Sequence, residues 1–230
     1  MKKIYSALLL LAIFSMSIMG HLLPPATTIA SGSSMPALPM IVIDPGHGGE
    51  DGGAIGPEGR PESQYNLEIA LKTELMLRFL GYQTTMTRTE DISIHDESAK
   101  TLRQKKNSDL ANRIRLIQSF DNAVFLSIHQ NKFEQTRFSG AQVFYNDAPS
   151  SAGLAKTVQD ALKAALNPRN ERQPKSLDVK LMNETRHPGV LVECGFLSNA
   201  AEEQRLRDPN YQRKLAMTLA ISLSKWVLQP

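Results

Sequence analysis

The sequence contains a single cysteine, Cys194, so no disulfide bond can form within the chain. Cys194 follows an apolar run, and the simplest interpretation is a small buried residue. No internal repeat is visible, which argues against a solenoid or another repeat architecture. The 230 residues are enough for one domain that buries a full hydrophobic core. The fold must therefore be held together by that core.

The sequence also lacks a marked excess of either charge. It has 26 Lys and Arg residues against 23 Asp and Glu residues, a formal net charge of +3. Removal of the first 30 residues, which carry two lysines and no acidic residue, would lower this charge to +1. No basic stripe interleaved with aromatic residues is present. These observations give no reason to expect a nucleic-acid partner.

Acidic residues are absent before Asp44, and the first 30 residues have the order of an export signal. Lys2 and Lys3 precede an apolar run at positions 4–20, and small residues follow it. The run has 17 residues, just below the roughly 18–20 of a membrane-spanning helix. It fits a cleaved signal peptide or a retained N-terminal membrane anchor. In both cases the sequence predicts an exported protein that works outside the cytoplasm.

The end of this leader can be placed from its composition. Thr28, Ile29 and Ala30, directly before Ser31, resemble a cleavage site. A stretch rich in Ser, Gly and Pro follows and is typical of a linker. We therefore predict three parts, which are a signal peptide or N-terminal anchor at 1–30, a linker at 31–39 and one folded domain at 40–230.

Short apolar runs rich in β-branched residues alternate with stretches of helical periodicity. The predicted strands are 41–43, 82–87, 123–128, 140–145, 177–182 and 190–193. A first helix is predicted to start at Glu62 and to end at Gly81. Its apolar face is predicted to consist of Leu67, Leu71, Leu75 and Phe79. The alternation predicts a single α/β domain with a largely parallel, twisted sheet of about six strands, flanked by helices.

Three further segments complete this prediction. Residues 90–108 are polar and lack a clear period, so we expect a surface loop there, with a flap over a functional site as the alternative. Asn199 with Glu202 three residues later has the reciprocal helix-capping pattern. Asp208 followed by Pro209 is typical of a helix start and predicts the last helix.

Two predicted strands run directly into histidines, and a third ends in a glutamate. His47 lies in a Gly-rich turn, His129 follows the strand 123–128, and Glu193 ends the strand 190–193. Glu62 begins the first helix. Ligands bind at the carboxyl edge of an open parallel sheet, so these four side chains are expected to converge. Two imidazoles and one carboxylate are ligands of a catalytic zinc site, and a second carboxylate can move protons.

Three motifs occur in order along the chain. They are DPGHGG at 44–49, SIHQN at 127–131 and VECGFLSN at 192–199. In this combination the chain resembles the zinc-dependent N-acetylmuramoyl-L-alanine amidases of bacterial cell walls. The resemblance implies one zinc ion per chain, bound by His47, Glu62 and His129, with Glu193 as the catalytic carboxylate. It also implies peptidoglycan as the substrate, cut at the amide between N-acetylmuramic acid and L-alanine of the stem peptide.

One position departs from the family pattern. The family usually has a lysine after the ligand glutamate, whereas this chain has Ser63. Glu62 keeps its spacing to Asn66 and stays the predicted ligand, with Glu58 as the alternative. The compact length and the basic stretch at 103–106 make the chain similar to the germination-specific amidases of spore-forming bacteria. This similarity implies a role in spore cortex maturation, through formation of muramic δ-lactam.

Several polar residues outside the proposed site allow two interpretations each. Arg88 and Arg113 fit contacts with stem-peptide carboxylates, or ion pairs with Asp91 and Asp109. His187 fits the rim of a substrate groove, or a simple turn.

Two other classes of function stay open on the sequence alone. A zinc carboxypeptidase acting on stem peptides would share the chemistry and cut a different bond. A non-catalytic wall-binding module would share the fold, although the presence of both Glu62 and Glu193 argues against it. An activating partner protein is also left open.

Overall fold

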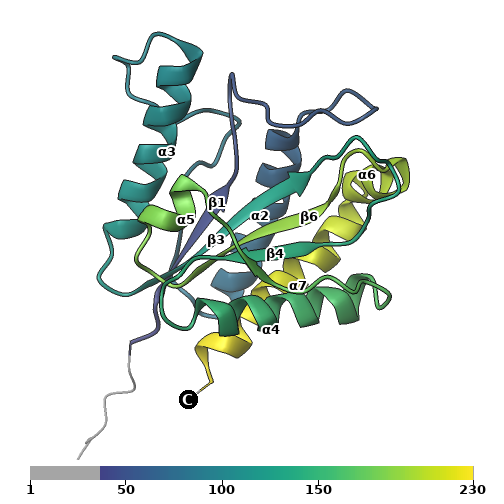
Figure 1. Cartoon of the computed structure of the whole chain (residues 1–230). Coiled ribbons are helices and arrows are strands. Elements are labelled where there is room, and N and C mark those ends of the chain that lie inside the picture. Colours follow the sequence, from purple (N-terminus) through teal and green to yellow (C-terminus); the bar gives the residue numbers. More distant parts are fainter. Residues whose placement is uncertain (1–36, 230) are drawn as a thin grey trace, which may run out of the picture. The chain divides into compact units, whose positions relative to one another are not determined.

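The computed structural model of the chain describes residues 37–229, and the predicted leader with its cleavage site lies outside them. These residues form a six-stranded sheet in the order β2-β1-β3-β6-β4-β5, with helices on both faces (Figure 1). The strands are β1 Met40–Pro45, β2 Thr84–Met86, β3 Ala123–Asn131, β4 Gln142–Tyr145, β5 Lys175–Ser176 and β6 Gly189–Phe196. The strands β2, β1, β3 and β6 are parallel, whereas β4 is antiparallel to β6. The prediction of a largely parallel sheet of about six strands is confirmed.

Within the described residues there are six helices, labelled α2 to α7. They are α2 Glu62–Phe79, α3 Leu102–Gln118, α4 Ser151–Leu166, α5 Lys180–Glu184, α6 Ala200–Arg207 and α7 Pro209–Val227. The larger core cluster contains side chains of α2, α4 and α7, and the smaller one contains side chains of α3 and α5. The two groups of helices therefore cover opposite faces of the sheet (Figure 1). Among these described helices, none combines the length and the apolar character that a membrane span requires.

The central strands begin with apolar runs because both of their faces are covered there. Ile41, Val42 and Ile43 of β1 are fully buried. Ile41 and Ile43 belong to the larger cluster, whereas Val42 belongs to the smaller cluster on the other face. A continuous apolar run is the expected pattern for a strand buried on both sides. This pattern is why the sequence predicts β1 and β3 correctly.

The predicted apolar face of α2 is wrong. Leu71, Leu75 and Phe79 are 40%, 63% and 87% exposed. The buried side chains are instead Glu62, Ser63, Tyr65, Asn66, Ile69, Ala70, Thr73 and Leu77. The rotation of α2 is fixed by Glu62 and Asn66, which bond to backbone groups at the sheet edge. Both stripes recur every fourth residue, so periodicity alone favoured the more hydrophobic of the two.

The predicted strand at 177–182 is also wrong. The strand β5 ends at Ser176, and the helix α5 begins at Lys180. Leu181 and Met182 pack as helical residues in the smaller core cluster. A short apolar run does not by itself distinguish a strand from a buried helix, which explains the error.

The predicted loop at 90–108 is wrong over its last residues, where α3 has already begun. The side chain of Thr101 accepts a hydrogen bond from the backbone N of Gln104, and the side-chain oxygen of Gln104 accepts one from the backbone N of Thr101. This capping box starts α3 at Leu102. The polar composition of the first two turns of α3 concealed the helix, and the capping pair was the missed signal.

Two predicted helix starts are confirmed. Asn199 caps α6, and its side chain accepts hydrogen bonds from the backbone of Ala201 and Glu202. The Glu202 carboxylate does not accept a hydrogen bond from the backbone N of Asn199, as a capping box would require. It accepts from the backbone N atoms of Gly140 and Phe196 instead. Asp208 caps α7, with a proline in the first turn as predicted.

Candidate metal centre

The carboxyl ends of β1, β3 and β6 meet at one edge of the sheet. His47 follows β1, His129 lies near the end of β3, and Glu193 is its direct neighbour on β6. Paired residues of neighbouring strands point to the same side of a sheet, so these two side chains share one face. The structure thus brings three sequence-predicted residues to the same edge.

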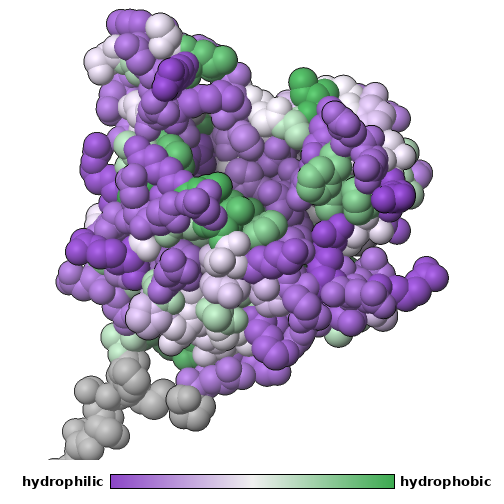
Figure 2. Space-filling view, in the orientation of Figure 1, coloured by the Kyte–Doolittle hydropathy of each residue, from purple (hydrophilic) through white to green (hydrophobic). Residues whose placement is uncertain are grey.

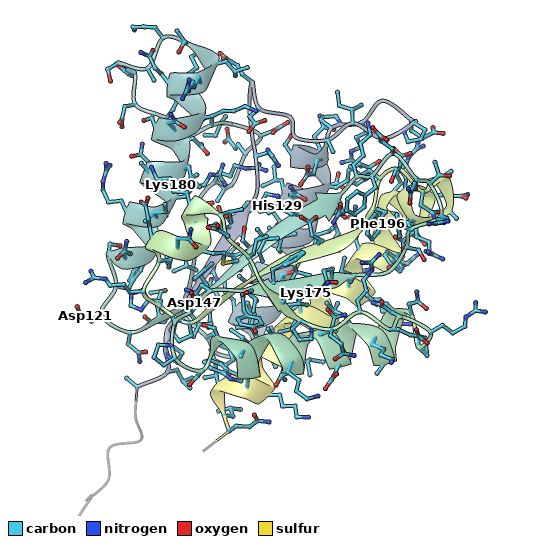
Figure 3. All side chains as sticks on the ribbon, in the orientation of Figure 1. Asp121, His129, Asp147, Lys175, Lys180 and Phe196 are labelled. Atoms are coloured by element: carbon cyan, nitrogen blue, oxygen red, sulfur yellow. The ribbon has the colours of Figure 1, made fainter. Side chains whose placement is uncertain are left out.

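This edge is hollowed and open to solvent. Figure 2 shows the hollow in the upper centre of the view, with mostly hydrophilic side chains in it. His129 lies at the same place in Figure 3. The helix α3 flanks one side of the hollow, and the segments that follow β3 and β6 flank the other (Figure 1). A long polymer can therefore approach the site without entering an enclosed cavity.

Glu62 reaches this edge from the first residue of α2, and both of its side-chain oxygens are held. Oε1 accepts hydrogen bonds from the backbone N of Gln130 at 3.0 Å and from Asn66 Nδ2 at 3.2 Å. Oε2 accepts from the backbone N of Ala54 at 2.9 Å. Asn66 also donates to the Gly46 carbonyl at 3.1 Å. The spacing of Glu62 to Asn66, one helical turn, therefore fixes the carboxylate against the His47 turn.

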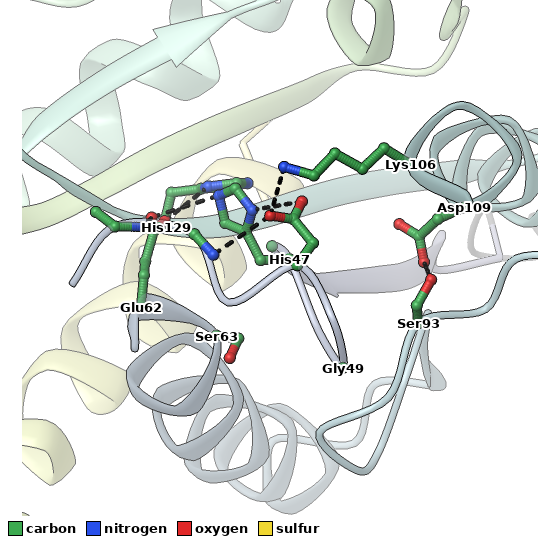
Figure 4. Close-up of polar contacts among 12 residues, drawn as sticks. His47, Gly49, Glu62, Ser63, Ser93, Lys106, Asp109 and His129 are labelled. Carbon is green, nitrogen blue, oxygen red and sulfur yellow. Dashed lines mark hydrogen bonds and ion pairs between the residues drawn. The ribbon is translucent and has the colours of Figure 1, made fainter. Parts of the chain in front are cut away.

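Two histidine rings face the Glu62 carboxylate (Figure 4). His47 Nε2 lies 3.4 Å from Glu62 Oε2, and His129 Nδ1 lies 3.0 Å from Glu62 Oε1. One ligand atom from each of the three residues lies within 4.8 Å of the other two. Burial alone would raise the pKa of Glu62, but the hydrogen bond and charge of His129 and the charge of His47 lower it to about 2. The carboxylate is therefore ionised at neutral pH.

The turn that carries His47 is tightly constrained. His47 has a φ of 60°, in the left-handed region that non-glycine residues rarely adopt. A Cβ atom at Gly46 would lie 2.1 Å from the ring of His129, so no larger residue fits there. The glycine allows the two histidines to approach each other, with ring centroids 5.0 Å apart.

Two arginines hold the backbone of this turn by hydrogen bonds to its carbonyl oxygens. Arg113 donates to the carbonyl oxygens of Pro45 at 2.8 Å and His47 at 2.7 Å. Arg88 donates to the carbonyl oxygens of Pro45 and Gly46, each at 3.0 Å. Both side chains are almost completely buried. They are therefore structural, and the alternative of binding stem-peptide carboxylates is wrong.

The expected ion pairs of these arginines are both present, at different distances. Arg113 Nε contacts Asp109 Oδ2 at 2.6 Å, whereas Arg88 lies 3.9 Å from Asp91. Arg88 also donates to the Ser63 carbonyl at 2.8 Å. Ser63 is fully buried, and its hydroxyl has no hydrogen-bond partner among the described residues. The serine at this position thus leaves the Glu62 carboxylate undisturbed.

Glu193 stands beside the three grouped residues. Its Oε2 is buried and has no hydrogen-bond partner within residues 37–229. Burial raises the pKa of Glu193 to about 7, with the charge of His129 opposing the shift and the charge of Glu62 adding to it. A carboxyl group with a pKa near neutrality can both accept and release a proton.

The side chains present fit a zinc ion. Two imidazole nitrogens and one carboxylate oxygen form a donor set of catalytic zinc, which leaves further positions for water and substrate. The histidine side chains are 26% and 19% exposed, so the open side of the group faces the hollow. Cys194 does not compete as a ligand, because it is buried and burial raises the pKa of its thiol.

The alternative candidates lie elsewhere. Glu58 is exposed and pairs with Arg207 at 2.7 Å, so it is not part of the group. His187 precedes the first residue of β6 and therefore lies at the opposite edge of the sheet. Its carbonyl accepts a hydrogen bond from Asn146. The turn interpretation of His187 is confirmed, and its placement at the groove is wrong.

Sequence reasoning missed two residues next to His47. Asp51 Oδ2 lies 3.0 Å from His47 Nδ1, and Lys106 Nζ lies 2.8 Å from Asp51 Oδ1. The available signal was a carboxylate four residues after His47 in the same Gly-rich turn. Lys106 gave no such signal, because its segment was expected to be a loop.

Comparisons with known proteins agree with this geometry. The N-acetylmuramoyl-L-alanine amidase family matches residues 41–225. The germination-specific N-acetylmuramoyl-L-alanine amidase of Bacillus subtilis is 35% identical over 78% of this chain and 76% of its own length. The amidase LytC of the same organism is 30% identical over 88% of this chain, which spans only 38% of LytC.

Solved structures show the same relationship. The CwlD amidase from Clostridioides difficile, solved in complex with the GerS lipoprotein, has a TM-score of 0.79 and 39% identity, covering 82% of this chain and 98% of that one. The amidase AmiC2 of Nostoc punctiforme has a TM-score of 0.72 and 26% identity, covering 83% of this chain and 97% of that one. The chain with this His-Glu-His group at its sheet edge belongs to the N-acetylmuramoyl-L-alanine amidase family.

Proposed function

We propose that the chain hydrolyses the amide between N-acetylmuramic acid and L-alanine in peptidoglycan, with one zinc ion held by His47, Glu62 and His129. The observation that carries this proposal is the grouping of three ligand atoms within 4.8 Å beside a buried, partnerless carboxylate oxygen. When bound, the zinc ion would polarise the scissile carbonyl and make a water molecule more acidic. The Glu-Asn pair on α2 and the backbone of Ala54 and Gln130 keep the Glu62 oxygens aimed at the histidines.

In this proposal Glu193 moves the proton. Its Oε2 accepts a proton from the attacking water and donates it to the leaving nitrogen of the alanine. Oε2 has no other hydrogen-bond partner among residues 37–229, so it is available for both proton contacts. The hollow beside it gives room for the glycan strand and the stem peptide.

The metal assignment is tested by elemental analysis of the purified full chain. We expect about one equivalent of zinc, lost in His47→Ala and in His129→Ala. Full metal content in both variants would remove the site as proposed.

The role of Glu193 is tested by the variant Glu193→Gln. We expect it to keep zinc and fold while losing turnover by on the order of 10²-fold or more, because glutamine cannot carry the proton. Loss of zinc would instead make Glu193 a ligand. Near-normal turnover would end its catalytic role.

The bond that is cut decides between the amidase and the zinc carboxypeptidase. Mass spectrometry of digested peptidoglycan should detect free stem peptides with a new N-terminal alanine, and uncut glycan strands. Products shortened only at the peptide C-terminus would support the carboxypeptidase, and unchanged material would support a non-catalytic wall-binding module.

A role in spore cortex maturation is proposed from the same relatives. The Bacillus subtilis relative is a germination-specific amidase, and the C. difficile relative was solved with a lipoprotein. We therefore expect this chain to be exported, to act in the cell wall or the forespore intermembrane space and to contribute to muramic δ-lactam. Deletion of the gene in a spore former should leave cortex without δ-lactam. Normal δ-lactam would refute the sporulation role and leave the amidase assignment intact.

The leader and the partner of the chain are part of this proposal. A retained leader would anchor the enzyme in the membrane, and a cleaved one would release it. The complex of the C. difficile enzyme with GerS supports the expectation that a partner protein also binds this chain. N-terminal sequencing of the exported protein and co-purification from sporulating cells test these two points.

A further inference from the structure

A chain of three polar side chains connects α3 with the ring of His47 (Figure 4). Lys106 Nζ lies 2.8 Å from Asp51 Oδ1, and Asp51 Oδ2 lies 3.0 Å from His47 Nδ1. The backbone of Asp51 also pairs with that of Gly48, by N–H···O bonds of 2.8 Å and 3.3 Å. The turn is therefore folded back so that the Asp51 carboxylate faces the imidazole.

This contact determines which nitrogen of His47 is left for a metal. An ionised carboxylate only accepts hydrogen bonds, so Nδ1 carries the hydrogen atom. The other ring nitrogen, Nε2, faces Glu62 Oε2 at 3.4 Å and is the nitrogen left for a metal, which would take the place of any hydrogen atom between the two groups. A histidine can ligate a metal only through a nitrogen with a free lone pair. The Asp51 contact thus leaves His47 in the form in which it can bind a metal on the side of the candidate site.

We propose that Asp51 and Lys106 are positioning residues for the metal ligand His47. Asp51 fixes the tautomer and the plane of the imidazole, and Lys106 holds the Asp51 carboxylate in place from α3. This inference rests on the proposed function, because it requires that His47 binds zinc. It assigns a role to α3, whose first turns the sequence analysis had placed in a surface loop.

A second contact from α3 reaches the same histidine independently. Arg113, two helical turns after Lys106, donates to the backbone carbonyl of His47 at 2.7 Å. Arg113 therefore fixes the backbone of His47, and the Lys106–Asp51 pair fixes its ring. Orienting a ligand before binding removes part of the ordering cost that binding would otherwise carry. The helix α3 is thus expected to raise the affinity of the site for zinc.

The neighbouring lysine provides a matched control. Lys105 Nζ lies 2.5 Å from Glu50 Oε1, in the same turn and on the same helix. Among the contacts of the described residues, Glu50 has none with His47, Glu62 or His129. Lys105→Ala therefore removes an equal charge and an equal side chain without touching the chain of contacts to His47.

The test is the zinc affinity of the full chain, measured by competition with a chromophoric chelator. We expect Asp51→Asn to weaken zinc binding by about 10- to 100-fold, the usual effect of losing the partner of a metal-bound histidine. Lys106→Ala should weaken it by about two- to fivefold, the size expected of a half-exposed ion pair. Lys106→Arg should restore the wild-type affinity, and Lys105→Ala should leave it unchanged.

Folding is separated from positioning by thermal unfolding of the metal-free variants. An unchanged unfolding temperature with weakened zinc binding supports the positioning role. If Asp51→Asn unfolds at a lower temperature, the zinc affinities of the three lysine variants decide whether the positioning role holds. Equal zinc affinities in Lys106→Ala and Lys105→Ala overturn the inference. Wild-type affinity in Asp51→Asn overturns it as well. A wild-type chain that binds no zinc would refute the metal centre itself, and the inference with it.

Discussion

A buried charge pair supports the turn that carries the candidate metal ligand His47. Arg113 Nη1 lies 2.7 Å from Asp44 Oδ1, and both side chains are almost completely buried. The other hydrogen bonds of the Asp44 carboxylate come from Thr87 Oγ1 and Ser127 Oγ, each at 2.7 Å. Removing one partner of such a pair leaves an uncompensated buried charge and is strongly destabilising. Asp44 thus anchors the arginine that holds the His47 carbonyl.

This pair predicts a specific loss of stability in acid. Burial alone would raise the pKa of Asp44, but Arg113 and the two hydroxyl groups lower it from 3.8 to about 2. A lowered pKa stabilises the folded state above the ordinary pKa, and this contribution is lost as the pH falls towards 2. The free-energy gap between wild type and Asp44→Asn in urea unfolding should therefore narrow by about 2 kcal/mol between pH 5 and pH 2.

The exposed carboxylate of Asp160 on α4 provides the control for this measurement. Asp160→Asn removes one carboxylate, whose ion-pair partner is the exposed Lys156. Its free-energy gap to wild type should stay nearly constant over the same pH range, because an exposed pair contributes little. A constant gap for Asp44→Asn as well would contradict the assignment.

At the scale of elements, the sequence predicts strands more reliably than helix orientation. The strands β1, β3 and β6 each contain a continuous apolar run, since both faces of the sheet are covered there. The edge strand β5 has only two residues and no apolar pattern, so it could not be predicted. The face of α2 that packs on the sheet contains the polar residues Glu62 and Asn66. A hydrophobicity pattern cannot predict that this face is the buried one, because it assigns polar residues to the exposed face.

The candidate site was predictable for a related reason. His47, His129 and Glu193 follow strands that are easily recognised, and the edge of a parallel sheet brings strand ends together. Glu62 was placed by its position at the helix start and by the family resemblance. Asp51 and Lys106 act through contacts between a turn and a distant helix, 55 residues apart for this pair. Such contacts have no periodic signal in a sequence.

The rotation of α2 can be tested with two leucines that are two residues apart. Leu77 is fully buried, whereas Leu75 is 63% exposed. Leu77→Ala should lower the free energy of unfolding by about 2–5 kcal/mol, the range for a buried leucine. Leu75→Ala makes the same chemical change on the same helix and should stay within about 0.5 kcal/mol of wild type. Equal losses in chemical denaturation would mean that the predicted Leu71-Leu75-Phe79 face is buried after all.

At the scale of the whole molecule, the three candidate ligands join separate parts of the fold. His47 follows β1, Glu62 begins α2, and His129 belongs to β3, which the chain reaches only after β2 and α3. A metal at this edge would bind the folded chain and not the unfolded one, since the three residues meet only in the native sheet. Metal binding and folding stability should therefore be linked.

Removal of zinc should lower the unfolding temperature of the full chain. A ligand present at about 100 times its dissociation constant stabilises the native state by about 2.7 kcal/mol. For a chain of this size, that free energy corresponds to a shift of roughly 5–10 °C. Addition of a strong chelator in differential scanning calorimetry should produce this decrease, and added zinc should reverse it. His129→Ala should unfold at one temperature with and without chelator, because it lacks a ligand. An equal shift in that variant would place the stabilising metal elsewhere in the protein, and the absence of a shift in the wild type would contradict the metal centre.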